Sequence, residues 1–140
     1  MANTILVLII VFVLLDFVID LILEALNIRN QKERLPERLK DFYDEEKYRK
    51  SIRYDREKTK LSLISTTLST IVILALLLTG GFGWLDEWVR GITEHPIGMA
   101  LLFFGVLYIA SDIIGLPFSL YNTFVIEEKY GFNRTTVKTY

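Results

Sequence analysis

Cysteine is absent from the 140 residues of the chain, and histidine occurs only once, at His95. Without cysteine the chain can form neither a disulfide framework nor a cysteine metal site. A zinc site normally needs three or four protein ligands, and a single histidine outside any His-Glu-x-x-His motif does not supply them. We therefore expect His95 to be a loop residue, and we expect no catalytic, metal-binding or cofactor-binding residue in this chain.

Apolar residues make up 51% of the chain and charged residues 24%, a combination that requires the two kinds to be segregated. Long apolar runs occupy residues 4–26, 61–79 and 97–118. At 1.5 Å per residue, a helix of this length reaches about 30 Å, the thickness of a bilayer core. The first run lacks the basic start and the cleavage pattern of a secretory signal, so we expect it to be retained. The sequence predicts an all-α integral membrane protein with about three transmembrane helices.

The segment 27–60 holds 12 of the 16 basic residues together with eight acidic ones. We expect a charged, largely helical loop outside the bilayer, because no glycine interrupts it and Pro36 suits the first turn of a helix. Most of these side chains should form an ordinary solvated face. The interleaved acids argue against a nucleic-acid partner. The basic residues suit anionic lipid headgroups, since each contributes about 1 kcal/mol near a membrane surface.

The distribution of basic residues predicts the orientation in the membrane. Lys and Arg concentrate in short cytoplasmic loops, and the connector 80–96 holds one basic residue against the twelve of 27–60. We expect 27–60 and the tail 126–140 in the cytoplasm, with the N-terminus and the connector outside. Trp84 and Trp88 in the connector are typical of interfacial anchors. The membrane would be the inner or plasma membrane of a prokaryote or the endoplasmic reticulum of a eukaryote.

Four acidic residues fall within the apolar runs. Asp16, Asp20 and Glu24 follow at i, i+4 and i+8, so they share one stripe of a helix. An acid in mid-bilayer costs about 2.5–3.5 kcal/mol, so such a stripe should face other helices or water. For Asp16 and Asp20 two interpretations stay open, a hydrated cavity wall or proton path, and neutral or paired side chains inside the bundle. Glu24 suits the interface, and Asp112 suits pairing with a basic residue, although it could line the same cavity.

The nineteen residues from Gly115 to Asn133, GLPFSLYNTFVIEEKYGFN, closely resemble a signature of the CAAX prenyl protease 1 family, a family of integral-membrane zinc metalloendopeptidases. A weaker resemblance to the family's segment before its second helix lies in Tyr48–Lys58, YRKSIRYDREK. The signature positions taken as candidate functional residues are Pro117, Ser119, Tyr121, Asn122, Glu127, Glu128, Lys129, Gly131, Phe132 and Asn133.

The resemblance implies a ring of seven membrane helices around a water-filled chamber, whose wall would include Asp16, Asp20, Glu24 and Asp112. It implies a zinc site on a His-Glu-x-x-His helix with a later glutamate, the first glutamate acting as general base. Eukaryotic members trim prenylated CAAX proteins, and prokaryotic relatives act on other membrane-associated substrates. This chain would be the N-terminal membrane domain, with the catalytic zinc domain absent. Its partners would be the lipid bilayer, the missing helices and catalytic domain, and a peptide or prenylated substrate.

Alternatives stay open at this point. Residues Glu127 to Asn133 would form a joint between the helix ring and the catalytic part, or only a helix end with Gly131 at positive φ. The chain ends without a cap or a fourth span, so we expect a piece of a longer protein or a shortened homologue. Two other functions are a non-enzymatic membrane adaptor that binds through 27–60, and a proton or ion path lined by Asp16, Asp20 and Asp112.

Overall fold

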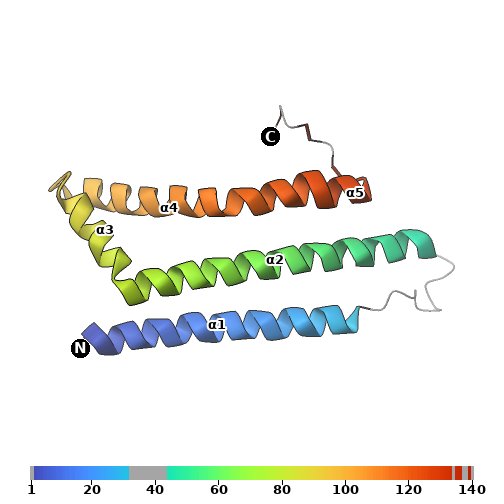
Figure 1. Cartoon of the computed structure of the whole chain (residues 1–140), viewed down its shortest axis with the longest axis horizontal. Coiled ribbons are helices and arrows are strands. Elements are labelled where there is room, and N and C mark those ends of the chain that lie inside the picture. The colour runs from blue at the N-terminus through green and yellow to red at the C-terminus, as the bar shows by residue number, and fades with distance from the viewer. Residues whose placement is uncertain (1, 32–43, 134, 137–138, 140) are drawn as a thin grey trace. The chain divides into compact units, whose positions relative to one another are not determined.

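The computed structural model describes residues 2–31, 44–133, 135–136 and 139 (Figure 1). Within these residues the chain is helical and contains no strand. Among the described residues, three helices are long and apolar enough to cross a membrane: α1 (Ala2–Asn30), α2 (Glu45–Thr79) and α4 (Pro96–Tyr121), which continues into further helical turns. The prediction of an all-α protein with about three membrane-spanning helices is confirmed. The interpretation of Pro36 as a helix start lies outside the described residues.

The chain divides into two compact units, each built from parts of several helices. The first unit comprises Met1–Phe17 and Thr66–Pro117, and the second comprises Val18–Ser65 and Phe118–Tyr140. None of the apolar windows of the three long helices is buried inside the protein. This exposure has a physical reason: in a bilayer, lipid chains surround an apolar helix as well as protein does, so a spanning helix needs no protein cover.

In the first unit, α2 ends at a glycine turn and a short helix follows. Gly80 adopts φ 76°, a left-handed conformation that glycine enters without strain, and α3 (Gly81–Arg90) begins directly after it. The apolar run predicted for 61–79 ends as expected before these glycines, whereas the helix in the connector was not predicted. In α3, Leu85 and Val89 are buried, at 7% and 1% exposed. Trp84 and Trp88 do not share this buried side of α3, and their side chains are 68% and 48% exposed.

In the second unit, α2 begins at a side-chain cap. The carboxylate of Asp44 accepts hydrogen bonds from the backbone N–H groups of Glu46 (2.9 Å) and Lys47 (3.4 Å), as an N-cap residue does. From Glu45 the helix runs 35 residues without interruption, a length of about 52 Å at 1.5 Å per residue. A bilayer core is only about 30 Å thick, so the charged first half of α2 extends beyond the apolar layer while its second half crosses it.

Pro117 lies inside α4 and does not end it. A proline within an apolar run can kink or end a helix, and the structure excludes an end at Pro117. The helix continues through Tyr121 into a π-helical segment, η2 (Asn122–Glu127), and a last turn, α5 (Glu128–Tyr130). The tail expected from residue 126 onward is therefore helical as far as Tyr130, and the signature residues stand on the end of a long helix.

Candidate functional site

The end of the third long helix changes from α- to π-helical geometry at Asn122. A π-helix pairs residue i with residue i+5, so Asn122 and Glu127 come onto the same side of the helix. Their side chains meet there, since the Asn122 Nδ2 atom donates a 3.0 Å hydrogen bond to the Glu127 carboxylate. Single π turns of this kind occur frequently at functional sites. Two signature residues thus stabilise the unusual turn between them.

The helix then stops at a complete Schellman motif. Gly131 has φ 71°, and its N–H donates to the carbonyl of Glu128 (3.0 Å). The N–H of Phe132 donates to the carbonyl of Glu127 (2.8 Å), so both characteristic bonds of the motif are present. The Asn133 side chain donates to the Glu128 carboxylate at 3.0 Å. The predicted turn with Gly131 at positive φ is confirmed, and it directs Phe132 away from the helix axis.

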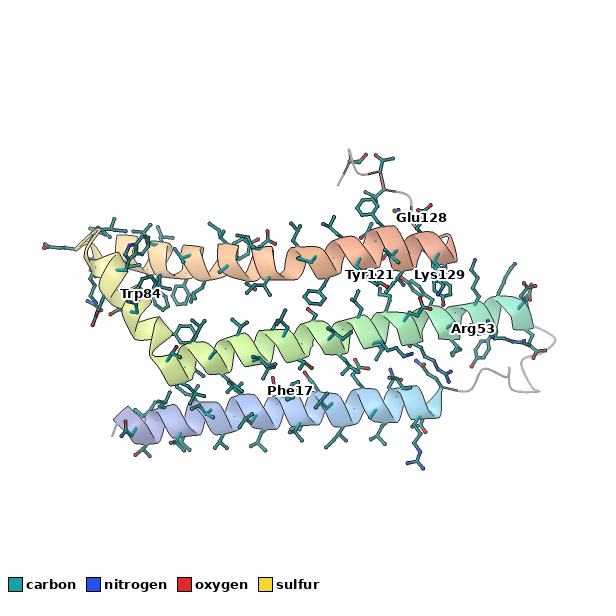
Figure 2. All side chains as sticks on the ribbon, viewed as in Figure 1. Phe17, Arg53, Trp84, Tyr121, Glu128 and Lys129 are labelled. Atoms are coloured by element: carbon teal, nitrogen blue, oxygen red, sulfur yellow. The ribbon has the colours of Figure 1, made fainter. Side chains whose placement is uncertain are left out.

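The residues after the π turn contact the charged half of α2. The rings of Tyr54 and Tyr130 meet edge to face with centroids 5.5 Å apart, and the Phe132 ring lies 4.8 Å from that of Tyr54. Lys129 and Glu57 form an ion pair, and Figure 2 shows Lys129 on the side of α5 nearest α2. The Lys50 ammonium lies 5.9 Å from the Phe132 ring centroid. We call this group the joint: Lys50, Tyr54, Glu57, Lys129, Tyr130 and Phe132.

Tyr130 is the member of the joint that is buried. Ile126 and Tyr130 are 2% and 7% exposed, and Thr59 of α2 is 7% exposed; these are the buried side chains among the described residues of the second unit. Lys50, Tyr54 and Glu57 follow at i, i+4 and i+7, which places them on one stripe of α2. The joint therefore combines the buried ring of Tyr130 with charged and aromatic side chains that are more exposed.

The charged half of α2 also contacts the end of α1. The Arg56 guanidinium donates a 2.7 Å hydrogen bond to the carbonyl of Gln31, the residue that follows α1. The Gln31 side-chain amide donates to the carboxylate of Asp55. The last carbonyls of a helix lack partners within the helix and carry partial negative charge, so a cationic donor stabilises them. Within the second unit, the charged half of α2 thus contacts both the residues that follow the π turn and the end of α1.

The ion pair of the joint lies outside the apolar runs, where both charges can reach water. The hydrogen bond from Lys129 lowers the pKa of Glu57 below its ordinary value of 4.5, against a smaller opposing effect of burial. The same bond raises the pKa of Lys129 above 10.5. Burial raises the pKa of Tyr130 above 10.0, with help from Glu57. The pair is charged at neutral pH, and Tyr130 is protonated.

The four acids expected to face a chamber remain exposed in this chain. Asp16, Asp20 and Asp112 are exposed, and Glu24 is partly exposed. None of them forms an ion pair within the part of the chain that the structure describes, so the pairing expected for Asp112 is not found there. The three acids of α1 share the stripe that their spacing predicts, but these helices do not cover it.

The other predicted residues are distributed along the end of α4 and the turn. Pro117, Ser119 and Tyr121 belong to α4, and Ser119 and Tyr121 are exposed. Asn133 completes the turn by accepting the N–H of Thr135 at 2.7 Å. His95 lies just before α4 and its N–H donates to the Thr93 hydroxyl at 3.2 Å, so its prediction as a loop residue is confirmed. Within residues 2–31, 44–133 and the few described beyond, no group of three potential metal ligands occurs.

Sequence reasoning missed the partners of the signature residues on α2. The sequence predicts an ordinary solvated face for most of 27–60 and does not single out Lys50, Tyr54 and Glu57, of which Lys50 is exposed and Tyr54 and Glu57 are half-buried. Two signals pointed to them: an aromatic residue, Tyr54, inside a highly charged segment, and the fact that all three fall in the weaker stretch of resemblance, Tyr48–Lys58. The structure brings the two resembling stretches into contact.

Comparisons with known proteins identify the family that the chain resembles. A family described as CAAX prenyl protease N-terminal, five membrane helices, matches residues 24–140. The chain is 34% identical over 122 residues to the probable CAAX prenyl protease 1 of Schizosaccharomyces pombe, covering 78% of this chain and 26% of that protein. It is 37% identical over 110 residues to the CAAX prenyl protease 1 homolog of Homo sapiens, covering 74% of this chain and 23% of that protein.

The fold has a counterpart among solved structures. The crystal structure of S. mikatae Ste24p matches with a TM-score of 0.80 at 29% identity, over 95% of this chain and 32% of that one. The chain thus spans about a quarter of the length of the curated relatives named above. The family description counts five membrane helices, and the described residues contain three that are long enough.

Proposed function

We propose, from the premise that the chain belongs to the CAAX prenyl protease N-terminal family, that it is the N-terminal membrane module of a zinc metalloendopeptidase. The proposal is carried by one observation. The signature residues Lys129, Tyr130 and Phe132 are not spread over a free helix end but pack onto Glu57 and Tyr54 of α2. The module therefore has a built joint at the end of its third long helix, where the remainder of a larger protein would attach.

The module would form part of the wall of an intramembrane chamber. The acids Asp16 and Asp20 lie in the middle of an apolar helix and are exposed in this chain. Facing lipid would cost each carboxylate about 2.5–3.5 kcal/mol, so a hydrated interior completed by further helices is the environment that fits them. Asp112 on α4 would face the same interior, and Glu24 would lie near its edge.

The zinc ion of such an enzyme would not be held by this chain. A zinc site takes three or four histidine, cysteine or carboxylate ligands. The sequence offers His95 and no cysteine, and no suitable group of three ligands occurs in the described ranges 2–31 and 44–133. The residues present do not fit the metal, so the catalytic groups would belong to the rest of the protein. Proteolysis of prenylated or other membrane-associated peptides would be an activity of that whole protein.

We further propose that the charged half of α2 and the joint lie in the cytoplasm, because basic residues concentrate there. The absence of cysteine makes a direct test possible. Single cysteines introduced as Lys47→Cys and Glu94→Cys would be treated in intact cells with a membrane-impermeant maleimide. We expect the Glu94→Cys variant to be labelled without lysis and the Lys47→Cys variant to be labelled only after lysis. The reverse pattern would overturn the orientation.

A chimeric enzyme tests the proposed function. This chain would replace the matching segment of the fission yeast relative, and cleavage of a prenylated CAAX peptide would be measured in membranes. We expect cleavage to be retained, to fall with Lys129→Glu, and to recover when Glu57→Lys is added. A chimera that inserts and folds normally but cleaves nothing, in parallel with an active native relative, would contradict the proposal.

A further inference from the structure

A half-open groove of about 1000 Å³ runs along the charged half of α2 and lies entirely within the second unit. Its lining residues on α2 recur at steps of three and four, so they form one face of the helix. Lys129 and Tyr130 of the joint close its side. The lining residues are Glu45, Glu46, Arg49, Lys50, Arg53, Arg56, Glu57, Lys60, Lys129 and Tyr130.

Positive charge predominates in this groove. Six of its side chains are basic and three are acidic. Two of the acids already have partners, because Glu45 pairs with Arg49 at 3.2 Å and Glu57 pairs with Lys129. Lys50 and Lys60 form no ion pair with any described residue. Arg53 lies between them in sequence, lines the same groove and is exposed; Figure 2 labels it on α2. The residues that line the groove thus carry a formal net charge of +3, from six basic and three acidic side chains.

The position of the groove relates this charge to the membrane. Lys60 is the last charged residue of α2, and the apolar run begins with Leu61. A helix that crosses a bilayer passes the layer of lipid phosphates where its polar part ends and its apolar part begins. Lys and Arg side chains near such a boundary reach toward the interface. The end of the groove at Lys60 therefore opens at the depth where the phosphate groups of lipids lie.

We propose that the groove binds the phosphate of an anionic phospholipid headgroup between Arg53 and Lys60, with Lys50 adding positive charge further along the same face. An arginine and a lysine two helical turns apart suit phosphate, because the guanidinium can donate two parallel hydrogen bonds while the ammonium group acts as a point charge. A lipid rather than a free phosphate is favoured because the groove meets the apolar run at Lys60. The proposal does not depend on the proteolytic function.

Native mass spectrometry of the purified chain in detergent tests this proposal. The protein would be titrated with phosphatidylglycerol, with phosphatidylcholine and with inorganic phosphate. We expect phosphatidylglycerol to bind more tightly than phosphatidylcholine, and a large excess of inorganic phosphate not to displace it. The variant Lys50→Gln, Arg53→Gln, Lys60→Gln should raise the Kd for phosphatidylglycerol about tenfold or more, as expected for three basic groups near a lipid surface.

The matched control removes three basic residues that do not line the groove. The variant Arg29→Gln, Lys47→Gln, Lys58→Gln has the same change in net charge on the same polar part of the chain. We expect its Kd to stay within about twofold of the native value, since side chains that do not line the groove donate no hydrogen bond to a phosphate bound in it. An equal loss in both variants would show unspecific attraction and overturn the proposal. The proposal would also be overturned if the protein showed no preference for phosphatidylglycerol, or if inorganic phosphate displaced the bound phosphatidylglycerol.

A second variant keeps the proposal testable if the first does not fold. Glu45→Gln with Glu46→Gln removes two acids from the groove and releases Arg49 from its ion pair. Both sites are exposed in the first turn of α2, so folding should be preserved. We expect tighter binding of phosphatidylglycerol with little change for phosphatidylcholine. Unchanged or weaker binding of the anionic lipid would contradict the proposed site.

Discussion

Lys129 and Glu57 are 72 positions apart in the chain and form an ion pair between α5 and α2. Beside this pair, Tyr130 and Phe132 pack against Tyr54. Each side of the contact comes from a stretch that by itself resembles the CAAX prenyl protease 1 family. The two stretches are therefore two halves of one structural feature, which explains why a helix end and a charged segment share that resemblance.

The first prediction concerns the two charges. Lys129→Glu or Glu57→Lys alone places like charges together and should lower the melting temperature of the detergent-solubilised chain. The double exchange should recover most of the loss, because it restores an opposite-charge pair in the same place. The measurement is thermal unfolding followed by circular dichroism. If the double variant is no more stable than the single ones, the ion pair does not form in detergent.

The second prediction concerns pH. The pKa of Glu57 lies below 4.5 in the folded protein because Lys129 donates to it, so this contact stabilises the fold above pH 4.5. The stabilisation should be lost as the pH falls from that value through the lower folded-state pKa. Glu57→Gln should show a weaker decline in melting temperature over this acid range. Identical pH profiles of the two proteins would count against the contact.

The third prediction concerns the aromatic contacts of Tyr54. Tyr54→Ala removes the ring that meets both Tyr130 and Phe132. Each aromatic pair contributes about 0.5–1.5 kcal/mol beyond area burial, so the free energy of unfolding should fall by about 1–3 kcal/mol. Tyr54→Phe retains the ring and serves as the control, with a change below about 0.5 kcal/mol. Unfolding in mixed detergent measures both, and equal losses in the two variants would refute the role of the ring.

The fourth prediction concerns the turn at Gly131. An alanine there must adopt φ near 71°, which costs roughly 1–2 kcal/mol for a residue with a Cβ. No backbone atom crowds the position, since the one neighbour of an added Cβ is the Lys50 Nζ atom at 3.9 Å. The control is Gly105→Ala, inside α4 with open space around it, where alanine favours the helix by about 1 kcal/mol. Opposite changes in stability are expected, and a neutral Gly131→Ala would be inconsistent with the Schellman motif.

The fifth prediction concerns the depth of α3. The two tryptophans of the chain both lie on α3 and are exposed there. Tryptophan at the end of a membrane span belongs at the interface, so intrinsic fluorescence should be quenched by lipids brominated near the headgroup. Lipids brominated near the chain end should quench it less. Strongest quenching at the bilayer centre would place α3 in the membrane interior instead.

Much of the fold follows from local properties of the sequence. A membrane-spanning segment must pair every backbone N–H and C=O within itself, so three apolar runs of the right length are sufficient to predict three helices. The ends of the apolar run at Gly80 and of the last helix at Gly131 were equally predictable, because only glycine enters the left-handed region readily. The helix in the connector was less visible, since its two buried residues alternate with exposed tryptophans over only ten residues.

The sequence by itself determined the segregation of this protein into apolar spans and one charged segment, since hydropathy acts residue by residue along the chain. Only the tertiary structure decided which charged residues meet. Glu57 pairs with Lys129, whereas Lys60, three positions further along α2, pairs with no described residue. Such pairing depends on the register between helices that are distant in sequence, and on the π turn at Asn122 that rotates the residues following it. Neither can be read from composition or periodicity.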